Sequence, residues 1–143
     1  MSIEYDIIRD KKLVLAKGSG VITGTDVREH LATLAKDERY KAPMKKLVDY
    51  RSVDTIRISR EEAYSIARMK VKLANTFTGE RCAFVSPKDE TYSASQVHRT
   101  LVDGIGLNTQ VFRRIEDALE WLDVTLDKNH EQWLINRHTV KRN

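Results

Sequence analysis

The sequence contains one cysteine, two prolines and no long apolar run. Because Cys82 stands alone, no disulfide can form within the chain, which favours a reducing compartment. No segment approaches the roughly 18 to 20 apolar residues that a membrane-spanning helix needs. The opening segment, MSIEYDIIRD, is acidic and too short of apolar residues for a signal peptide. We therefore expect a cytoplasmic protein with no membrane span.

Motifs typical of catalytic, metal and phosphate sites are missing as well. No two histidines have the spacing of three or four that is common in zinc sites; they are His30, His98, His130 and His138. The GSG at Gly18–Gly20 lacks the longer frame of a phosphate-binding loop and indicates a flexible strand exit. There is no GxSxG motif, and no cationic cluster flanks Cys82, which is expected to be a small buried residue. We therefore expect a non-catalytic protein with no metal and no cofactor.

Charges of the two signs nearly balance along the chain. The 25 lysines and arginines face 21 aspartates and glutamates, and the signs are interleaved. This pattern favours a solvated mixed surface over the basic stripe of a nucleic-acid-binding protein, so no nucleic acid partner is expected. A chain of 143 residues with 41% hydrophobic residues is long enough for one domain with its own core.

Apolar periodicity predicts strands alternating with helices. The predicted strands cover 3–8, 13–21, 45–50, 82–85 and 109–114, and the predicted helices begin near residues 25, 59, 93 and 115. The two-residue link Asp10-Lys11 makes the first two strands antiparallel, whereas the later strands are separated by helices and should be parallel. The fold class is therefore α/β, with a single mixed, mostly parallel five-stranded sheet flanked by about four helices. Its core should include the apolar runs of the later strands: Leu47, Val48, Phe84, Val85, Val111 and Phe112.

Helix boundaries can be predicted from capping signals. Ser59 and Glu62 have the spacing of a capping box, and Ser93 and Gln96 repeat it. Thr23 or Thr25 can cap the first helix, and Gly104 is suited to end the third. On the helix after Ser59 the buried positions are apolar apart from Lys70; they are Ala63, Ile66, Ala67, Lys70, Val71 and Ala74.

The segment KKLVDYRSVD leading into a long helix, together with the preceding strand pair and helix, resembles the STAS domain superfamily. That superfamily includes bacterial anti-sigma-factor antagonists and the cytoplasmic ends of sulphate transporters. The closing VFRRIEDALEWL is similar to a SpoIIAA-like branch of small bacterial proteins. The resemblance covers about residues 3 to 124, so we expect a STAS/SpoIIAA-like domain over residues 1–126 and a C-terminal extension over 127–143.

The resemblance implies a regulatory or binding module that takes a protein partner or a small ligand. A similarity in architecture to CRAL-TRIO lipid-transfer domains suggests one alternative, a carrier of a lipid or a small apolar or anionic molecule. Another alternative is an uncharacterised enzyme that uses the crevice at the strand ends. In phosphoregulated members, the serine of the switch would fall on Ile58, which has no hydroxyl, and Ser59 is better explained as a helix cap.

The predicted ligand site lies at the carboxyl ends of the parallel strands, where open α/β sheets bind their ligands. The candidate residues are Arg51, Ser59, Ser86 and Lys88. Helix N-termini supply free N–H groups there, and the basic side chains favour an anion.

The extension carries an apolar cluster of Trp133, Leu134 and Ile135. Three adjacent apolar residues on a tail seldom remain in water. We expect them to pack across a homodimer interface, or failing that against the sheet edge or helices of their own chain.

Overall fold

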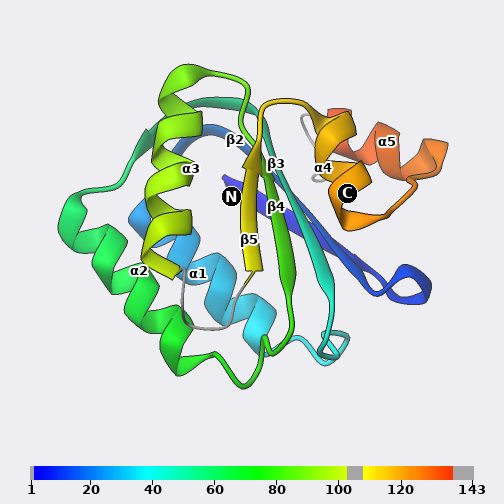
Figure 1. Cartoon of the computed structure of the whole chain (residues 1–143), viewed down its shortest axis with the longest axis horizontal. Helices are drawn as coiled ribbons and strands as arrows, with labels where there is room; N and C mark the ends of the chain where they lie inside the picture. Colours follow the sequence, from blue (N-terminus) through cyan, green and yellow to red (C-terminus); the bar gives the residue numbers. More distant parts are fainter. Residues whose placement is uncertain (1, 103–107, 137–143) are drawn as a thin grey trace, which may run out of the picture.

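One five-stranded sheet forms the centre of the computed structural model, which describes residues 2–102 and 108–136 (Figure 1). Its strand order is β1-β2-β3-β4-β5, with β1 antiparallel to β2 and every later pair parallel. The strands are β1 (Ile3–Ile8), β2 (Leu13–Thr23), β3 (Lys45–Arg57), β4 (Arg81–Val85) and β5 (Asn108–Phe112). The mixed, mostly parallel sheet predicted from the sequence is confirmed.

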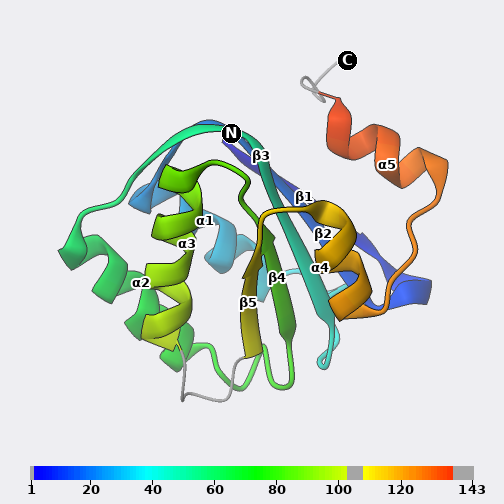
Figure 2. The ribbon, with the colours of Figure 1, turned by 45° about the horizontal axis from the view of Figure 1, so that its top comes forward.

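Helices cover both faces of the sheet. Figures 1 and 2 show α1, α2 and α3 on one face and the shorter α4 and α5 on the other. Their bounds are α1 (Gly24–Ala35), α2 (Arg60–Lys72), α3 (Asp89–Val102), α4 (Ile115–Leu122) and α5 (Lys128–Ile135). Within the described part of the chain, none of these helices is both long and apolar enough to span a membrane.

Strand side chains alternate between the two faces, as the two-residue period of a strand requires. On β2, Leu13 and Leu15 pack with α4 and α5, whereas Val14 between them packs with α1 and α2. On β3, Leu47 points to the α4 side and Val48 to the opposite side. All but one of the six core residues predicted from the sequence are buried, and the sixth, Phe112, is partly buried against the α4 side.

The β2 strand was predicted over 13–21, with Gly18–Gly20 as a flexible exit, but it runs through these glycines and continues to Thr23. The glycines instead accompany two register shifts against β3, and Gly20 takes the left-handed φ of 67° that glycine tolerates best. A Cβ at Gly18 would lie 2.9 Å from two ring atoms of Tyr50, so this glycine makes room for the tyrosine ring.

Gly18→Ala should lower the free energy of unfolding by about 1 to 3 kcal/mol, because the buried Tyr50 ring has to move. Urea unfolding measures this loss. In a Tyr50→Leu background the same change should cost less, giving a clear coupling energy in a double-mutant cycle. Strictly additive losses would mean that the two residues do not compete for space.

Two of the predicted helix caps are confirmed. Ser59 accepts a hydrogen bond from the Glu62 N–H at 3.1 Å, and the Glu62 carboxylate accepts one from the Ser59 N–H at 2.9 Å. Thr23 forms the same box with Asp26 at the start of α1. The capping box predicted at Ser93 is wrong, because α3 already begins at Asp89. The acidic side chains in its first turn interact favourably with the positive end of the helix dipole. The predicted cap at Gly104 lies outside the described residues.

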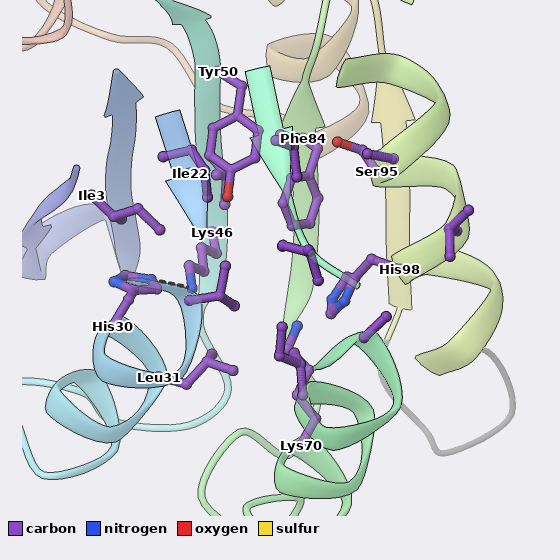
Figure 3. Close-up of a pocket in the computed structure, with 18 residues that line it drawn as sticks. Ile3, Ile22, His30, Leu31, Lys46, Tyr50, Lys70, Phe84, Ser95 and His98 are labelled. Atoms are coloured by element: carbon purple, nitrogen blue, oxygen red, sulfur yellow. Dashed lines mark hydrogen bonds between the residues drawn. The ribbon is translucent and has the colours of Figure 1, made fainter. Parts of the chain in front are cut away.

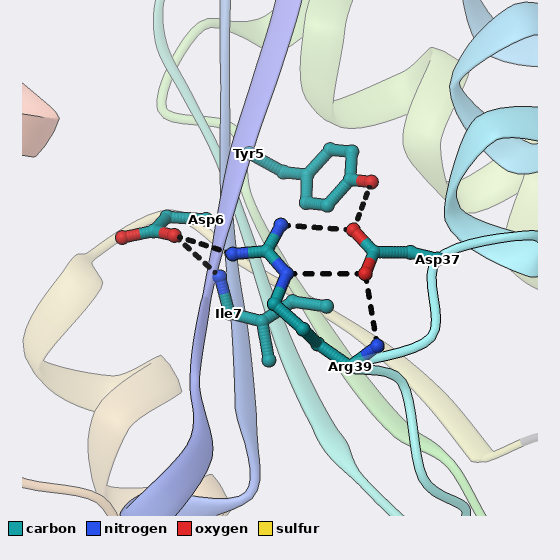
Figure 4. A network of polar contacts seen from close by, with 5 residues as sticks. All are labelled: Tyr5, Asp6, Ile7, Asp37 and Arg39. Atoms are coloured by element: carbon teal, nitrogen blue, oxygen red, sulfur yellow. Dashed lines mark hydrogen bonds and ion pairs between the residues drawn. The ribbon is translucent and has the colours of Figure 1, made fainter.

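A polar network fixes the loop after α1 to β1 (Figure 4). The Tyr5 hydroxyl donates to Asp37 at 2.7 Å, and the Arg39 guanidinium donates to both oxygens of the same carboxylate. Arg39 also reaches Asp6 at 3.3 Å, and the Asp6 carboxylate accepts from the Ile7 N–H. Burial and the adjacent Asp37 raise the pKa of Tyr5 to about 12, so the phenol remains a donor at neutral pH.

Within the predicted extension, Lys128–Ile135 form α5, which packs on the α4 face of the sheet. Leu134 is buried in that core and Trp133 packs against it, while Ile135 is 65% exposed. Lys17 of β2 donates to the carbonyls of Trp133 and Asn136 at 2.6 and 2.7 Å. The apolar cluster is therefore partly used within its own chain; a homodimer through Trp133, Leu134 and Ile135, and a domain boundary at residue 126, remain predictions.

Candidate ligand-binding pocket

A pocket of about 180 Å³ lies between the sheet and the three helices α1, α2 and α3 (Figure 3). Strands β1 to β4 form its floor, and each of the three helices contributes one turn or more of its inner face. Most of its wall is aliphatic or aromatic: Ile3, Ile22, Val27, Leu31, Val48, Ile56, Ile58, Ala63, Ile66, Phe84, Ala94 and Val97. The remaining lining residues are polar: His30, Lys46, Tyr50, Lys70, Ser95 and His98.

Lys46 reaches the pocket from the central strand of the sheet. It alternates with Leu47 and so shares the face of Val48, with Val14 and Cys82 beside it on the neighbouring strands. Its Nζ lies 2.7 Å from Nε2 of His30 on α1. Burial and the nearby lysine lower the pKa of His30 to about 2, so the imidazole is neutral and accepts this hydrogen bond from the ammonium.

Lys70 and His98 enter the pocket from α2 and α3, opposite His30 and Lys46 (Figure 3). Lys70 is only 4% exposed, and no hydrogen bond to its side chain is found among the described residues. The Nε2 atom of His98 is buried without a hydrogen-bond partner. Burial, together with Lys70 and Lys46, holds the pKa of His98 well below its usual range.

Glu80 is a carboxylate that offsets the positive charge of Lys46, although it does not line the pocket. It is 4% exposed, accepts a hydrogen bond from the Tyr40 hydroxyl at 2.8 Å, and acts electrostatically on Lys46. Burial still lowers the pKa of Lys46 from its ordinary value. The adjacent Cys82 is a neutral thiol, because burial and then Glu80 raise its pKa to about 11.

The chain matches no protein-family model and no curated protein, but solved structures share its fold. One is an uncharacterised DUF3478-family protein with a SpoIIAA-like fold from Shewanella loihica, with a TM-score of 0.57 and 22% identity over 85% of this chain and 94% of that one. Another is the anti-sigma factor antagonist SpoIIAA in its unphosphorylated form, with a TM-score of 0.50 and 10% identity over 86% of this chain and 99% of that one.

This chain has the SpoIIAA-like fold. The resemblance found in the sequence is thereby confirmed at the level of fold. In this domain with a SpoIIAA-like fold, Ile56 and Ile58 both line the pocket. Ser59 next to it is exposed and occupied as the cap of α2. The end of β3 and the residues just before α2 therefore contribute to the wall of the pocket.

The four site residues predicted from the sequence do not line this pocket, and each has a partner within the chain. Arg51 lies within β3, and its guanidinium binds the Asp49 carboxylate at 2.8 Å. Lys88 donates to the Val53 carbonyl at 3.0 Å. Among the described residues, no hydrogen bond or ion pair joins any two of the four.

Of the four predicted site residues, Ser86 is the one that contacts a residue lining the pocket. It is fully buried, and its hydroxyl oxygen lies 3.0 Å from that of Ser95, which lines the pocket. An anion site formed by Arg51, Ser59, Ser86 and Lys88 remains a prediction, and an anion there would share the arginine and the lysine with their present partners.

Sequence reasoning missed the basic side chains of the pocket, although two signals were present. Lys70 is the polar exception on the buried face of α2, and Lys46 shares the strand face of Val48 and Tyr50. A charged residue at a buried position is seldom there for packing alone. No such signal marked His30 or His98. His30 binds Lys46, and His98 comes under the electrostatic influence of both lysines, only through the packing of the helices on the sheet.

No metal site is found in the described ranges: no group of three histidine, cysteine, aspartate or glutamate side chains is placed to hold an ion.

Proposed function

We propose that this SpoIIAA-like chain is a non-catalytic binding module whose pocket holds a small, mostly apolar molecule. The observation that carries the proposal is the pocket between the sheet and α1 to α3, whose wall is formed largely by isoleucine, valine and phenylalanine. Its volume of about 180 Å³ exceeds the roughly 150 Å³ of an apolar cavity known to bind benzene. A single aromatic ring or a short aliphatic chain therefore fits.

The arrangement of the wall supports entry from solvent between the helices. Val97 lines the pocket and yet is 54% exposed, so the inner wall continues to the surface on α3. The floor is supplied by the paired strands of the sheet, which have little freedom to collapse into the space. A pocket of this kind is typical of small-molecule sites, which are concave, mostly apolar and largely preformed.

The size of the pocket distinguishes between the two kinds of carrier considered from the sequence. A small apolar or anionic molecule fits about 180 Å³, whereas a lipid with long acyl chains does not without rearrangement. Binding of a protein partner remains a further proposal, because the fold is compatible with it and the pocket does not decide it.

The enzyme alternative has one observation in its favour, at a different place from the strand-end crevice on which it was based. Lys46 has a lowered pKa, a histidine neighbour and a second lysine nearby, which is an environment that can activate an amine as a nucleophile. We favour binding over catalysis because every lining group described above is either apolar or suited to holding a ligand.

Replacing Ala63 by Phe should abolish binding of the neutral probe toluene, because the new ring occupies the pocket. In the unchanged chain, toluene should shift the amide resonances of pocket residues on α2 and α3 in a ¹H–¹⁵N NMR titration. Val71→Phe is the matched control: it places the same aromatic ring on α2 away from the pocket, and binding should persist. Val71 was predicted to be buried but is 53% exposed. If toluene leaves these resonances unchanged in the unmodified chain, the pocket does not bind apolar molecules.

A further inference from the structure

Four basic side chains from four separate elements line the pocket: His30 of α1, Lys46 of β3, Lys70 of α2 and His98 of α3. Among the described residues that line it, none is acidic. An apolar ligand alone gives no reason for this composition, since burying a lysine ammonium is costly unless it is paired. The arrangement therefore indicates a ligand with a negative charge as well as an apolar body.

We propose that the pocket recognises a small apolar monocarboxylate, whose carboxylate lies between Lys46 and Lys70 and whose apolar part contacts the aliphatic wall. The proposal deepens the function proposed above and rests on it. Both lysines are 4% exposed, so their charges act in a medium poor in water, where attraction to an anion is strong.

Unused hydrogen-bonding capacity at the two lysines supports this assignment. An ammonium has three donors, and in the described chain the only hydrogen-bond partner of Lys46 Nζ is the neutral His30. For the Lys70 side chain, no hydrogen-bond partner is found in the described part of the chain. A carboxylate has two oxygens with about four acceptor positions, so it can accept from both ammonium groups at once.

His98 supplies an independent observation in favour of a ligand. Its Nε2 atom is buried and unpartnered, and Figure 3 shows the ring directed into the pocket. Buried polar atoms in folded proteins nearly always have a partner, so this one indicates a group still to be bound. A neutral imidazole that carries its proton on Nε2 can donate to the same carboxylate.

The charge of the surroundings favours a monoanion. Among the described groups that act on Lys46, Glu80 is the one carboxylate and Cys82 is a neutral thiol, so the two lysines leave an excess of about one positive charge. A monocarboxylate neutralises that excess, whereas a phosphate dianion would exceed it and would bring several oxygens against an aliphatic wall. The small volume also leaves room for only one polar head beside the apolar part.

The test compares phenylacetate with phenylacetamide, which have nearly the same shape and differ in charge. By isothermal titration calorimetry, the full chain should bind phenylacetate about tenfold or more tighter than the amide, as expected for hydrogen bonds to a charged group. Lys46→Met and Lys70→Met should each remove most of this preference and leave binding of the amide nearly unchanged. Both replacements put an apolar side chain in a buried position, so the fold should tolerate them.

Lys72→Met is the matched control on α2, because it removes an exposed lysine two positions from Lys70 and should leave the preference intact. Lys70→Arg keeps the charge and should retain the preference for phenylacetate. NMR shifts should locate both probes at α2 and α3. Phenylacetate shifts confined to other surfaces would overturn the proposal.

The outcomes separate this proposal from the one on which it rests. Equal binding of acid and amide in the pocket would overturn carboxylate recognition and leave the apolar pocket in place. A chain that binds toluene, phenylacetamide and phenylacetate nowhere in the pocket would overturn both.

Proton uptake gives a second readout. The groups that act on Lys46 are Glu80, Cys82, Lys70 and His30. Since burial lowers the pKa of Lys46, an arriving carboxylate should raise it again, and phenylacetate affinity should fall as the pH rises through the Lys46 pKa. An affinity that is independent of pH up to the ordinary lysine range in both the unmodified chain and Lys46→Met would contradict a role for Lys46.

Discussion

Acidification from about pH 6.5 to about pH 4.5 should lower the free energy of unfolding by about 2 kcal/mol through His30, and further through His98. The cause is the pair of pocket histidines, whose pKa values lie far below the ordinary value near 6.5: His30 at about 2, and His98 also well below. Below about pH 6.5 both imidazoles are protonated in the unfolded chain, whereas in the folded chain burial keeps His30 neutral and disfavours protonation of His98. Stability is therefore present above the unfolded pKa and is lost as the pH falls.

Each histidine contributes about 1.4 kcal/mol per pH unit once the pH is well below 6.5. Urea unfolding at a series of pH values measures this slope. His30→Gln and His98→Gln should each reduce the slope by about half, whatever they do to the stability at pH 7. A slope that neither variant changes would show that the imidazoles are protonated in the folded state.

Asp37 acts in a separate, lower pH window. The Arg39 guanidinium holds the pKa of this carboxyl below its usual range. Its contribution is present above the ordinary aspartate pKa near 3.9 and is lost as the pH falls through the folded value. The histidine slope above about pH 4.5 is thus free of this carboxylate.

Lys17→Met should release α5 from the sheet, with a local loss of about 2 to 3 kcal/mol. The Lys17 ammonium donates to two carbonyls at the carboxyl end of α5 and lies 4.3 Å from the centre of the Trp133 ring. Hydrogen bonds that involve a charged group stabilise a fold by about 1.5 to 3 kcal/mol each, and the burial that lowers the pKa of Lys17 offsets part of this. A helix as short as α5 is not stable by itself, so it should unfold once it is released.

Hydrogen exchange of the α5 amides measures the release, and it should accelerate about 30-fold or more. Lys45→Met is the matched control, since it also removes a lysine-to-carbonyl hydrogen bond, from Lys45 to Asp123 at 3.3 Å, but at the surface. Unchanged protection of α5 in Lys17→Met would show that packing of Leu134 alone holds the helix.

The fold was predictable because its signals are local. The two-residue period of Leu47 and Val48, the cap at Ser59 and the short link before Leu13 each depend on neighbours in the sequence. The order of the strands in the sheet was not predicted from the sequence; the structure supplies it. The predicted start of α3 was wrong. Ser93 is a residue type that often caps helices, but here it lies inside the helix, four residues after its start.

The pocket was not predictable to the same degree, because its basic groups converge only in three dimensions. His30 and His98 are far apart in the sequence, and their neighbours do not distinguish them from surface histidines. The side chains of the predicted strand-end site also have partners within the chain: Asp49, two residues before Arg51, binds it, whereas Lys88 binds the distant Val53 carbonyl. Sequence alone does not show which partner such a side chain takes.

The network of Tyr5, Asp37, Arg39 and Asp6 has a consequence for association by strand addition. An edge strand attracts other chains through its unpaired N–H and C=O groups. On β1, the Ile7 N–H already binds the Asp6 carboxylate, and Arg39 lies against that carboxylate from the loop after α1. At the opposite edge, β5 has only five residues. Both edges are thus poor templates for another strand, which favours helices and loops over β-augmentation as the surfaces for a partner protein.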